Sequence, residues 1–277
     1  PLAASHLDDC AALVAASYRS LRAQAPELPE RYADPAVILP LVQRITARAP
    51  GVVALRDGRP VGFLSAWMTP EHRGHPTVYS PEWANGAIED NSPRIYQQMY
   101  AAMAEHWVAE GFCDHFLTLF VHNRAAIEAW QWLGFGYAVM DAVRDLSPVA
   151  AAATGIDVRR ASLADLPRVL PLWLALHAHL VAAPVFLVDG LQPDRAEFER
   201  WLSDERNALW VAFQRDEAVA ILGIGPSGDN ACTVVRDPGT ASIISAYTLP
   251  RARGDGIASA VLNRAVAWAR SEGYVRC

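Results

Sequence analysis

The chain has 277 residues, 52% hydrophobic and 19% charged, a composition typical of folded globular proteins and unlike that of disordered chains. Its formal net charge of −6 argues against nucleic acid or an anionic membrane surface as the main partner. The four cysteines lie far apart without a Cys-x-x-Cys pair, which excludes a disulfide framework and a zinc site and favours a cytoplasmic protein with reduced thiols.

The first half of the chain alternates helical and strand patterns. His6–Tyr18 has apolar residues at helical spacing, and Arg56-Asp57-Gly58 joins two alternating apolar runs, as a hairpin turn does. Tyr100–Phe112 has the pattern of an amphipathic helix. After it we predict a strand at Phe116–His122, a helix at Asn123–Leu133 and a strand that reaches about Asp145.

The second half repeats this order at a spacing of about 160 residues. Its helix start is Ser162–Trp173, its hairpin turn is Arg215-Asp216-Glu217, and its amphipathic helix is Leu262–Tyr274. The sequence therefore predicts two copies of one α/β unit, with a first domain at 1–147, a linker at 148–156 and a second domain at 157–277. Prolines interrupt the uncharged run Val169–Val188, so a buried helix and a loop are expected there, not a membrane span.

The two copies differ at their ends. The first continues past Gly111 with a strand, a helix and another strand, whereas only four residues follow Gly273 in the second. We therefore expect the second domain to lack its C-terminal strand and helix here, and the native chain to extend to about residue 307. The first domain opens on Pro1 with no strand before its first helix, so we expect a clipped start as well.

A glycine-rich loop, Arg253-Gly254-Asp255-Gly256-Ile257-Ala258, lies between a predicted strand, Thr240–Leu249, and a helical run that begins at Ser259. This order forms an anion site, because glycines allow close approach and the first-turn N–H groups of a helix face the ligand. An ordinary strand-to-helix turn is the alternative. The spacing does not fit the Gly-x-Gly-x-x-Gly dinucleotide fingerprint, and nothing else in the chain supports an adhesion role for Arg-Gly-Asp.

The frame Thr248–Ala258 resembles motif A of the GNAT superfamily of N-acetyltransferases, whose backbone amides hold the pyrophosphate of acetyl-CoA. The resemblance implies that the strand parts from its neighbour to admit pantetheine, and that a neutral amine attacks the thioester directly. The backbone of Ala246, Tyr247 and Thr248 would bind the pantetheine amides and the thioester oxygen, where negative charge develops. The pyrophosphate would lie on the loop residues Arg253, Gly254, Asp255, Gly256, Ile257 and Ala258.

The first copy carries a second resemblance, since Asn123–Phe135 is similar to motif B of the same family. There the asparagine helps bind pantetheine and a tyrosine protonates the leaving thiolate, but Trp130 stands in the tyrosine's place, and an indole N–H is no usable acid. Tyr79–Trp83 matches the end of the motif A strand, but Ala84–Glu89 replaces the glycine loop, and about seven extra residues precede the helix. Three acidic residues crowd the expected phosphate position, which predicts a degenerate copy: Glu82, Glu89 and Asp90.

Proton carriers are harder to assign. The cofactor strand offers Ser242, Ser245 and Tyr247, of which Tyr247 is our catalytic candidate, with simple packing as the alternative. His177 and His179 lie on the helical run that borders the acceptor cleft in this family, and their spacing lets at most one of them line it. Ordinary partly buried histidines are the alternative for both. The position of the family's acid falls beyond Cys277, and no histidine spacing supports a metal site.

Together these features predict an α/β (α+β) protein of two tandem GNAT-like domains, each a mixed, mostly antiparallel sheet flanked by helices, similar in architecture to mycothiol synthase. The implied function is an acetyl-CoA-dependent N-acetyltransferase acting on the primary amine of a small molecule, with a homodimer as one oligomeric state. A non-catalytic acyl-CoA-sensing protein and a partner-binding protein that has lost both sites are the alternatives.

Overall fold

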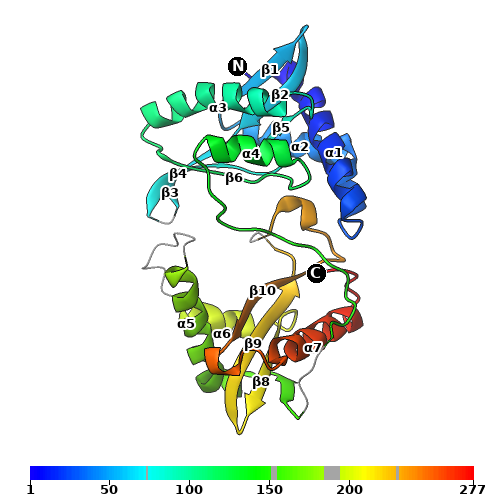
Figure 1. Ribbon diagram of the computed structural model, residues 1–277, viewed down its shortest axis with the longest axis vertical. Helices are drawn as coiled ribbons and strands as arrows, with labels where there is room; N and C mark the ends of the chain where they lie inside the picture. The colour runs from blue at the N-terminus through cyan, green and yellow to red at the C-terminus, as the bar shows by residue number, and fades with distance from the viewer. Residues whose placement is uncertain (73, 151–154, 184–193, 229–230) are drawn as a thin grey trace. The chain divides into compact units, whose positions relative to one another are not determined.

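The computed structural model describes residues 1–72, 74–150, 155–183, 194–228 and 231–277 (Figure 1). Part of the expected linker and the end of the uncharged run, including Pro184, lie outside the described residues. The chain divides into two compact units: unit 1 is Pro1–Tyr137 together with Cys232–Val234, and unit 2 is Ala138–Ala231 together with Val235–Cys277.

The division falls after Tyr137, whereas the sequence analysis placed the end of the first domain at residue 147. The residues in between belong to unit 2 because their backbone pairs with the last residues of the chain. Arg144 N–H donates to Cys277 O at 2.8 Å, and Cys277 N–H donates to Arg144 O at 3.0 Å. An isolated antiparallel bridge joins Asp145 to Arg276 beside them.

Unit 1 has helices on two small sheets. The helices are α1 (Leu7–Gln24), α2 (Pro35–Thr46), α3 (Ser92–Ala109) and α4 (Arg124–Trp132). The strands are β1 (Gly51–Arg56), β2 (Arg59–Ser65), β3 (Trp67–His72), β4 (His75–Ser80), β5 (Asn85–Ala87) and β6 (Asp114–Leu117). One sheet has the order β1-β2-β5 and the other β3-β4-β6, in which β4 and β6 are parallel. Asp57 and Gly58, both at positive φ, close the predicted β1–β2 hairpin.

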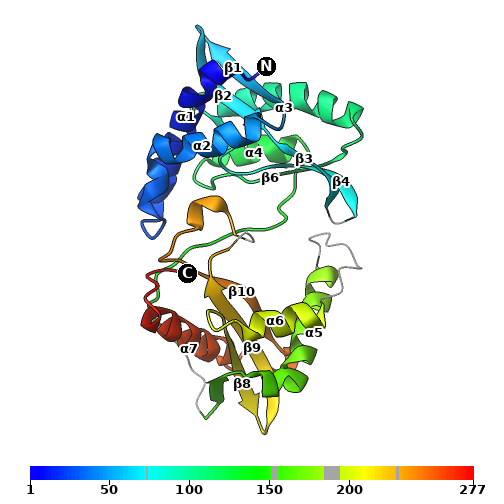
Figure 2. The same ribbon diagram turned by 180° about the vertical axis from the view of Figure 1, so that it is seen from behind.

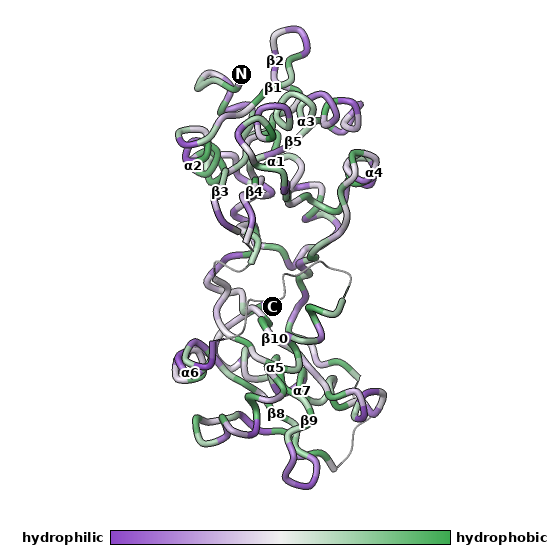
Figure 3. The backbone as a smooth tube through the Cα atoms, turned by 90° about the vertical axis from the view of Figure 1, so that its left-hand side faces the viewer, coloured by the Kyte–Doolittle hydropathy of each residue, from purple (hydrophilic) through white to green (hydrophobic). Residues whose placement is uncertain are grey.

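Unit 2 is a four-stranded sheet between helices (Figures 1 and 2). Its elements are β7 (Asp157–Arg160), α5 (Leu166–Ala182), α6 (Arg195–Ser203), β8 (Ala208–Gln214), β9 (Glu217–Pro226), β10 (Ala241–Thr248) and α7 (Ile257–Ser271). The strand order is β10-β9-β8-β7, and each neighbouring pair is antiparallel. The tube of α6 is largely hydrophilic in Figure 3, in keeping with a helix that buries only Phe198.

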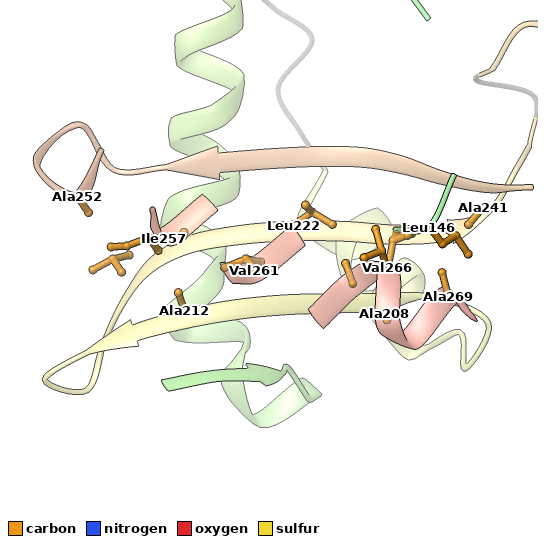
Figure 4. Close-up of a cluster of buried hydrophobic side chains, with 14 residues drawn as sticks. Leu146, Ala208, Ala212, Leu222, Ala241, Ala252, Ile257, Val261, Val266 and Ala269 are labelled. Atoms are coloured by element: carbon orange, nitrogen blue, oxygen red, sulfur yellow. The ribbon is translucent and has the colours of Figure 1, made fainter. Parts of the chain in front are cut away.

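Alternation along the strands places a hydrophobic core on each face of this sheet. On β8, Leu209, Val211 and Phe213 point to the cluster that includes residues of α5 and α6, whereas Ala208 and Ala212 point to the cluster that includes α7. Figure 4 shows the α7 side, where Ile257, Val261, Val266 and Ala269 meet small and aliphatic residues of β8 and β9. The predicted class, mixed α/β with mostly antiparallel sheets flanked by helices, is confirmed.

Several predicted elements differ in extent. The strand expected at Phe116–His122 ends at Leu117, α3 begins at Ser92 within the expected insertion, and no strand forms before Asp145. Val139 and Met140 in that last segment are 73% and 68% exposed. A strand is stable only when another strand pairs with it, so the apolar residues of this segment do not suffice to form one.

Candidate cofactor and active site

The glycine loop connects β10 to α7 through a single 3₁₀ turn, η5 (Pro250–Ala252). Gly254 has φ +91° and Gly256 has φ +76°, a left-handed conformation that other residues rarely adopt. Gly256 is the N-cap of α7, and no side chain caps this helix. The first-turn N–H groups and the positive end of the helix dipole therefore remain available to an anion, as predicted for a pyrophosphate site.

A cavity of about 490 Å³ lies along β10 and the start of α7. The predicted cofactor residues line it, with the exception of Asp255, whose side chain is exposed. The walls also include three residues of β9 that sequence reasoning did not assign to the site, Ala220, Ile221 and Leu222, and His179 of α5, one of the two histidines considered for the cleft. The structure thus brings the strand end, the loop and the helix start together around one cavity.

The register of β10 decides which backbone groups face away from β9. Leu249 N–H donates to Val219 O at 2.9 Å, and Tyr247 lies opposite Ile221 two residues earlier. Because successive residues of a strand direct their amides to opposite edges, Tyr247 points its backbone at β9, whereas Ala246 and Thr248 point theirs away. Of the three residues expected to bind pantetheine through the backbone, Ala246 and Thr248 are therefore oriented for that contact.

Arg253 supplies the positive charge at the loop. Its Nε donates to Thr248 O at 2.9 Å, and its guanidinium carbon lies 5.6 Å from the centroid of the Tyr247 ring. Arg253 is thereby held over the end of β10, next to the start of α7. The neighbouring Arg251 lies outside this cavity, where it forms a 2.5 Å ion pair with Glu217.

Two side chains with transferable protons face each other in the cavity. The His179 and Tyr247 rings have centroids 6.1 Å apart and come from α5 and β10. His177 does not line the cavity, in agreement with the helical spacing that admits at most one of the two histidines. Ser242 and Ser245 do not line it either. Ser245 lies against Gly223, where an added Cβ would come within 2.6 Å of the serine Oγ.

Residues 173–277 match the family model of the acetyltransferase (GNAT) family. This part of the chain is a GNAT acetyltransferase domain. The predicted family, the acetyltransferase class and acetyl-CoA as the co-substrate are confirmed at this level. Among curated proteins, none matches the chain significantly.

Solved structures similar to the chain include further acetyltransferases. A ribosomal-protein-alanine N-acetyltransferase from Brucella melitensis biovar Abortus 2308 has 18% identity, over 43% of this chain and 75% of its own, at a TM-score of 0.32. A GCN5-related N-acetyltransferase from Ralstonia eutropha JMP134 has 22% identity, over 44% and 80%, at a TM-score of 0.36. A predicted acetyltransferase with acetyl-CoA from Clostridium acetobutylicum has 21% identity, over 43% and 76%, at a TM-score of 0.33. At these values the family assignment rests on the sequence match alone.

Outside the GNAT domain, the motif B-like segment of unit 1 has structural roles. Asn123 caps α4, because its Oδ1 accepts a hydrogen bond from Ala126 N–H at 3.0 Å. Trp130 is 3% exposed, and its ring centroid lies 4.9 Å from that of Phe135 and 5.3 Å from that of Tyr100. The indole that stands in the place of the family's tyrosine thus packs in an aromatic cluster.

In unit 1, Asn85 holds the loop that the sequence analysis matched to the glycine loop. Its Nδ2 lies within hydrogen-bond distance of Ser80 Oγ (3.2 Å), Pro81 O (3.0 Å) and Thr118 O (3.2 Å). The three acidic residues expected to crowd this place differ in their surroundings. Asp90 pairs with Arg56 at 2.9 Å, Glu89 is 73% exposed, and Glu82 is buried.

Neither a metal centre nor a membrane segment was found in the part of the chain that the structure describes. No group of three or more histidine, cysteine, aspartate or glutamate residues there is arranged to hold a metal ion. No helix within those residues has the length and apolar character that crossing a membrane requires.

Proposed function

We propose that unit 2 binds one molecule of acetyl-CoA along β10 and the start of α7, and transfers its acetyl group to the primary amine of a small molecule. The observation that carries this proposal is the combination of an uncapped helix N-terminus, two left-handed glycines and outward-facing strand amides around one cavity. The helix end suits a pyrophosphate, and the strand amides suit the peptide-like groups of pantetheine.

The chemistry follows from what lines the cavity. An outward amide of β10, at Ala246 or Thr248, is placed to stabilise the negative charge that forms on the thioester oxygen during attack. The amine must lose protons on the way to the amide, and the thiolate must gain one. Tyr247 and His179 carry transferable protons and face each other in the cavity, so we assign these steps to them.

The first experiment is calorimetric titration of the protein with acetyl-CoA, with stoichiometry as the primary result. We expect one site per chain, and at least tenfold weaker binding in Gly256→Glu, because a carboxylate at the helix N-cap repels the pyrophosphate and strains the left-handed backbone. Gly273→Glu is the matched control, since Gly273 also has positive φ (+89°) and lies in open space just past the other end of α7.

If Gly256→Glu keeps the wild-type affinity for acetyl-CoA, the cofactor binds elsewhere and the proposed site is wrong. Weakening of equal size in both variants would assign the loss to backbone strain instead of to the phosphate position. A wild-type protein without affinity for acetyl-CoA would refute the proposed function as a whole.

A non-catalytic acyl-CoA sensor is the second candidate, and one observation favours it. Among the described residues that line the cavity there is no carboxylate, the usual base for an ammonium group. Release of CoA thiol across a panel of small amines separates the two candidates, because a sensor binds acetyl-CoA without turnover on any of them. Light scattering on the same sample tests the predicted homodimer.

We place the protein in the cytoplasm on the basis of its thiols. Cys10, Cys113, Cys232 and Cys277 are all free of disulfide bonds, as expected in a reducing compartment.

A further inference from the structure

Three residues from the second half of the sequence belong to unit 1. The chain leaves unit 2 after Ala231, contributes Cys232–Val234 to unit 1, and re-enters unit 2 at Val235. We call Cys232–Val234 the tongue. Its base is closed by Arg236, whose Nε and Nη2 donate to Ala231 O at 2.8 and 2.6 Å. Arg236, the second residue after the tongue, is thus held to Ala231, the residue before it.

Three residues of unit 1 bind the tongue: the consecutive residues Glu82 and Trp83, and Tyr18, whose hydroxyl donates to Val234 O at 3.3 Å. Glu82 Oε1 accepts a hydrogen bond from Val234 N–H at 3.0 Å, and Trp83 Nε1 donates to Thr233 Oγ1 at 2.9 Å. Glu82 is 3% exposed, Trp83 is fully buried, and Val234 is 4% exposed. The Glu82–Val234 hydrogen bond is therefore buried, and the Trp83–Thr233 hydrogen bond is partly buried. Leaving a buried donor or acceptor without its partner carries a desolvation cost.

Glu82 and Trp83 end the segment of unit 1 that matches the motif A strand end, directly before Ala84–Glu89, which stands in place of the glycine loop. They come two and three residues after β4 ends at Ser80, whereas the glycine loop follows β10 through η5. The cofactor loop presents N–H donors to an anion, whereas the loop of unit 1 presents a carboxyl oxygen as acceptor. An acceptor in this place repels a phosphate and is complementary to a peptide N–H.

We propose that Glu82 and Trp83, which lead into the degenerate loop of the first repeat, form a peptide-binding site that the tongue of the same chain occupies in cis. The backbone N–H of Val234 takes the place of the anion as the ligand, and the hydroxyl of Thr233 adds a second point of recognition. The acidic residue that rules out a second acetyl-CoA is thus the residue that binds the tongue. This inference goes beyond acetyl transfer and does not depend on it.

Hydrogen–deuterium exchange of the full chain at Val234 tests the proposal, because this amide donates to Glu82. We expect exchange slowed at least about a hundredfold relative to an unstructured peptide, and accelerated at least about tenfold in Thr233→Val, which keeps the shape but removes the acceptor of Trp83. Thr233→Ser keeps the hydroxyl and should remain within about threefold of wild type.

A second pair of variants tests the other hydrogen bond. Glu82→Leu removes the acceptor of Val234 N–H and should accelerate its exchange at least about tenfold, whereas Glu82→Gln keeps an acceptor and should restore most of the protection. Exchange at Val234 as fast as in a free peptide would overturn the proposal. So would equal protection in Thr233→Val and Thr233→Ser, since the hydroxyl would then play no part.

Calorimetry on the same variants keeps this inference separate from the proposed function. Thr233→Val should still bind a single acetyl-CoA per chain, because Glu82 stays in the loop when the tongue is released. A second equivalent of bound acetyl-CoA would show that the loop is a blocked cofactor site and not a peptide site. If the wild-type protein binds no acetyl-CoA, the proposed function fails, but the exchange experiment still tests whether Glu82 and Trp83 bind the tongue.

Discussion

At the scale of single residues, the side chains that face each other across the cavity determine which chemistry unit 2 can perform. Tyr247 packs partly against the core between α5 and the sheet, yet its ring also faces His179 and lies under Arg253. Because Tyr247 both packs in the core and faces the cavity, its catalytic role is tested by removing the hydroxyl alone, which leaves the ring in place to pack.

We expect Tyr247→Phe to lower kcat about a hundredfold for the best amine of a panel, with acetyl-CoA affinity unchanged, because a general acid contributes about 10²–10⁴-fold. His179→Gln should lower kcat by a similar factor and alter the pH dependence of kcat/KM. The measurement is CoA thiol release as a function of pH. His177→Gln is the matched control, since His177 lies on the same helix outside the cavity. Unchanged kcat in Tyr247→Phe and His179→Gln would show that these two residues only pack in the structure and take no part in catalysis.

At the scale of elements, α5 presents His179, and its start is held by a buried carboxylate. Asp165 accepts hydrogen bonds from Arg159 Nη2 at 2.6 Å and Nη1 at 2.9 Å, and from the N–H and Oγ of Ser162. The Arg159 guanidinium, with help from Ser162, holds the pKa of Asp165 well below its usual range, although burial opposes this shift. A folded-state pKa below that of the unfolded chain means that the ionised carboxylate stabilises the fold.

We expect Asp165→Asn to lower the free energy of unfolding at pH 7 by about 1–2 kcal/mol, because two charge-assisted hydrogen bonds become weaker. This stabilisation is complete above the unfolded pKa of about 4 and is lost as the pH falls below it, so the two proteins should converge in acid. Urea denaturation at a series of pH values from 7 to 3 measures the difference. Asp204→Asn is the control, since its partner Arg206 is 75% exposed and the pair should matter little. A constant difference across the series would contradict the assignment.

At the scale of the whole molecule, the two units differ in the segments that the sequence analysis matched to each other. Unit 2 has the glycine loop, whereas in unit 1 Asn85 hydrogen-bonds the neighbouring backbone, and Glu82 and Trp83 hydrogen-bond the tongue. Restoring the lost glycines and arginine therefore does not restore the site, because the supporting contacts have changed with them.

We expect the triple variant Ala84→Arg, Asn85→Gly, Ala87→Gly to bind one acetyl-CoA per chain, as the wild type does. It should also be less stable by at least about 3 kcal/mol, because Ala84→Arg puts a charged side chain at a fully buried position and the hydrogen bonds of Asn85 to Pro81 O and Thr118 O are lost. Calorimetry and urea denaturation measure the two effects. A gain of a second site would contradict our account of the first repeat.

The sequence by itself determined the features that depend on neighbouring residues. Hairpin turns at Asp57-Gly58 and Arg215-Asp216, the glycine loop before α7 and the helix capped by Asn123 all follow from local backbone preferences and spacing, and the structure contains each of them. The match of residues 173–277 to the GNAT family likewise rests on sequence alone.

Only the tertiary structure decided which of these residues face a cavity, an edge or a core. The register of β10 against β9 directed the backbone N–H and C=O groups of Ala246 and Thr248 away from β9 and those of Tyr247 toward it. The packing of α5 brought His179, but not His177, to the cavity. The hydrogen bond between Glu82 and Val234 joins residues 152 positions apart, so no local pattern announces it. Strand register and buried polar partners depend on what the rest of the chain packs against them, and a single sequence does not specify that locally.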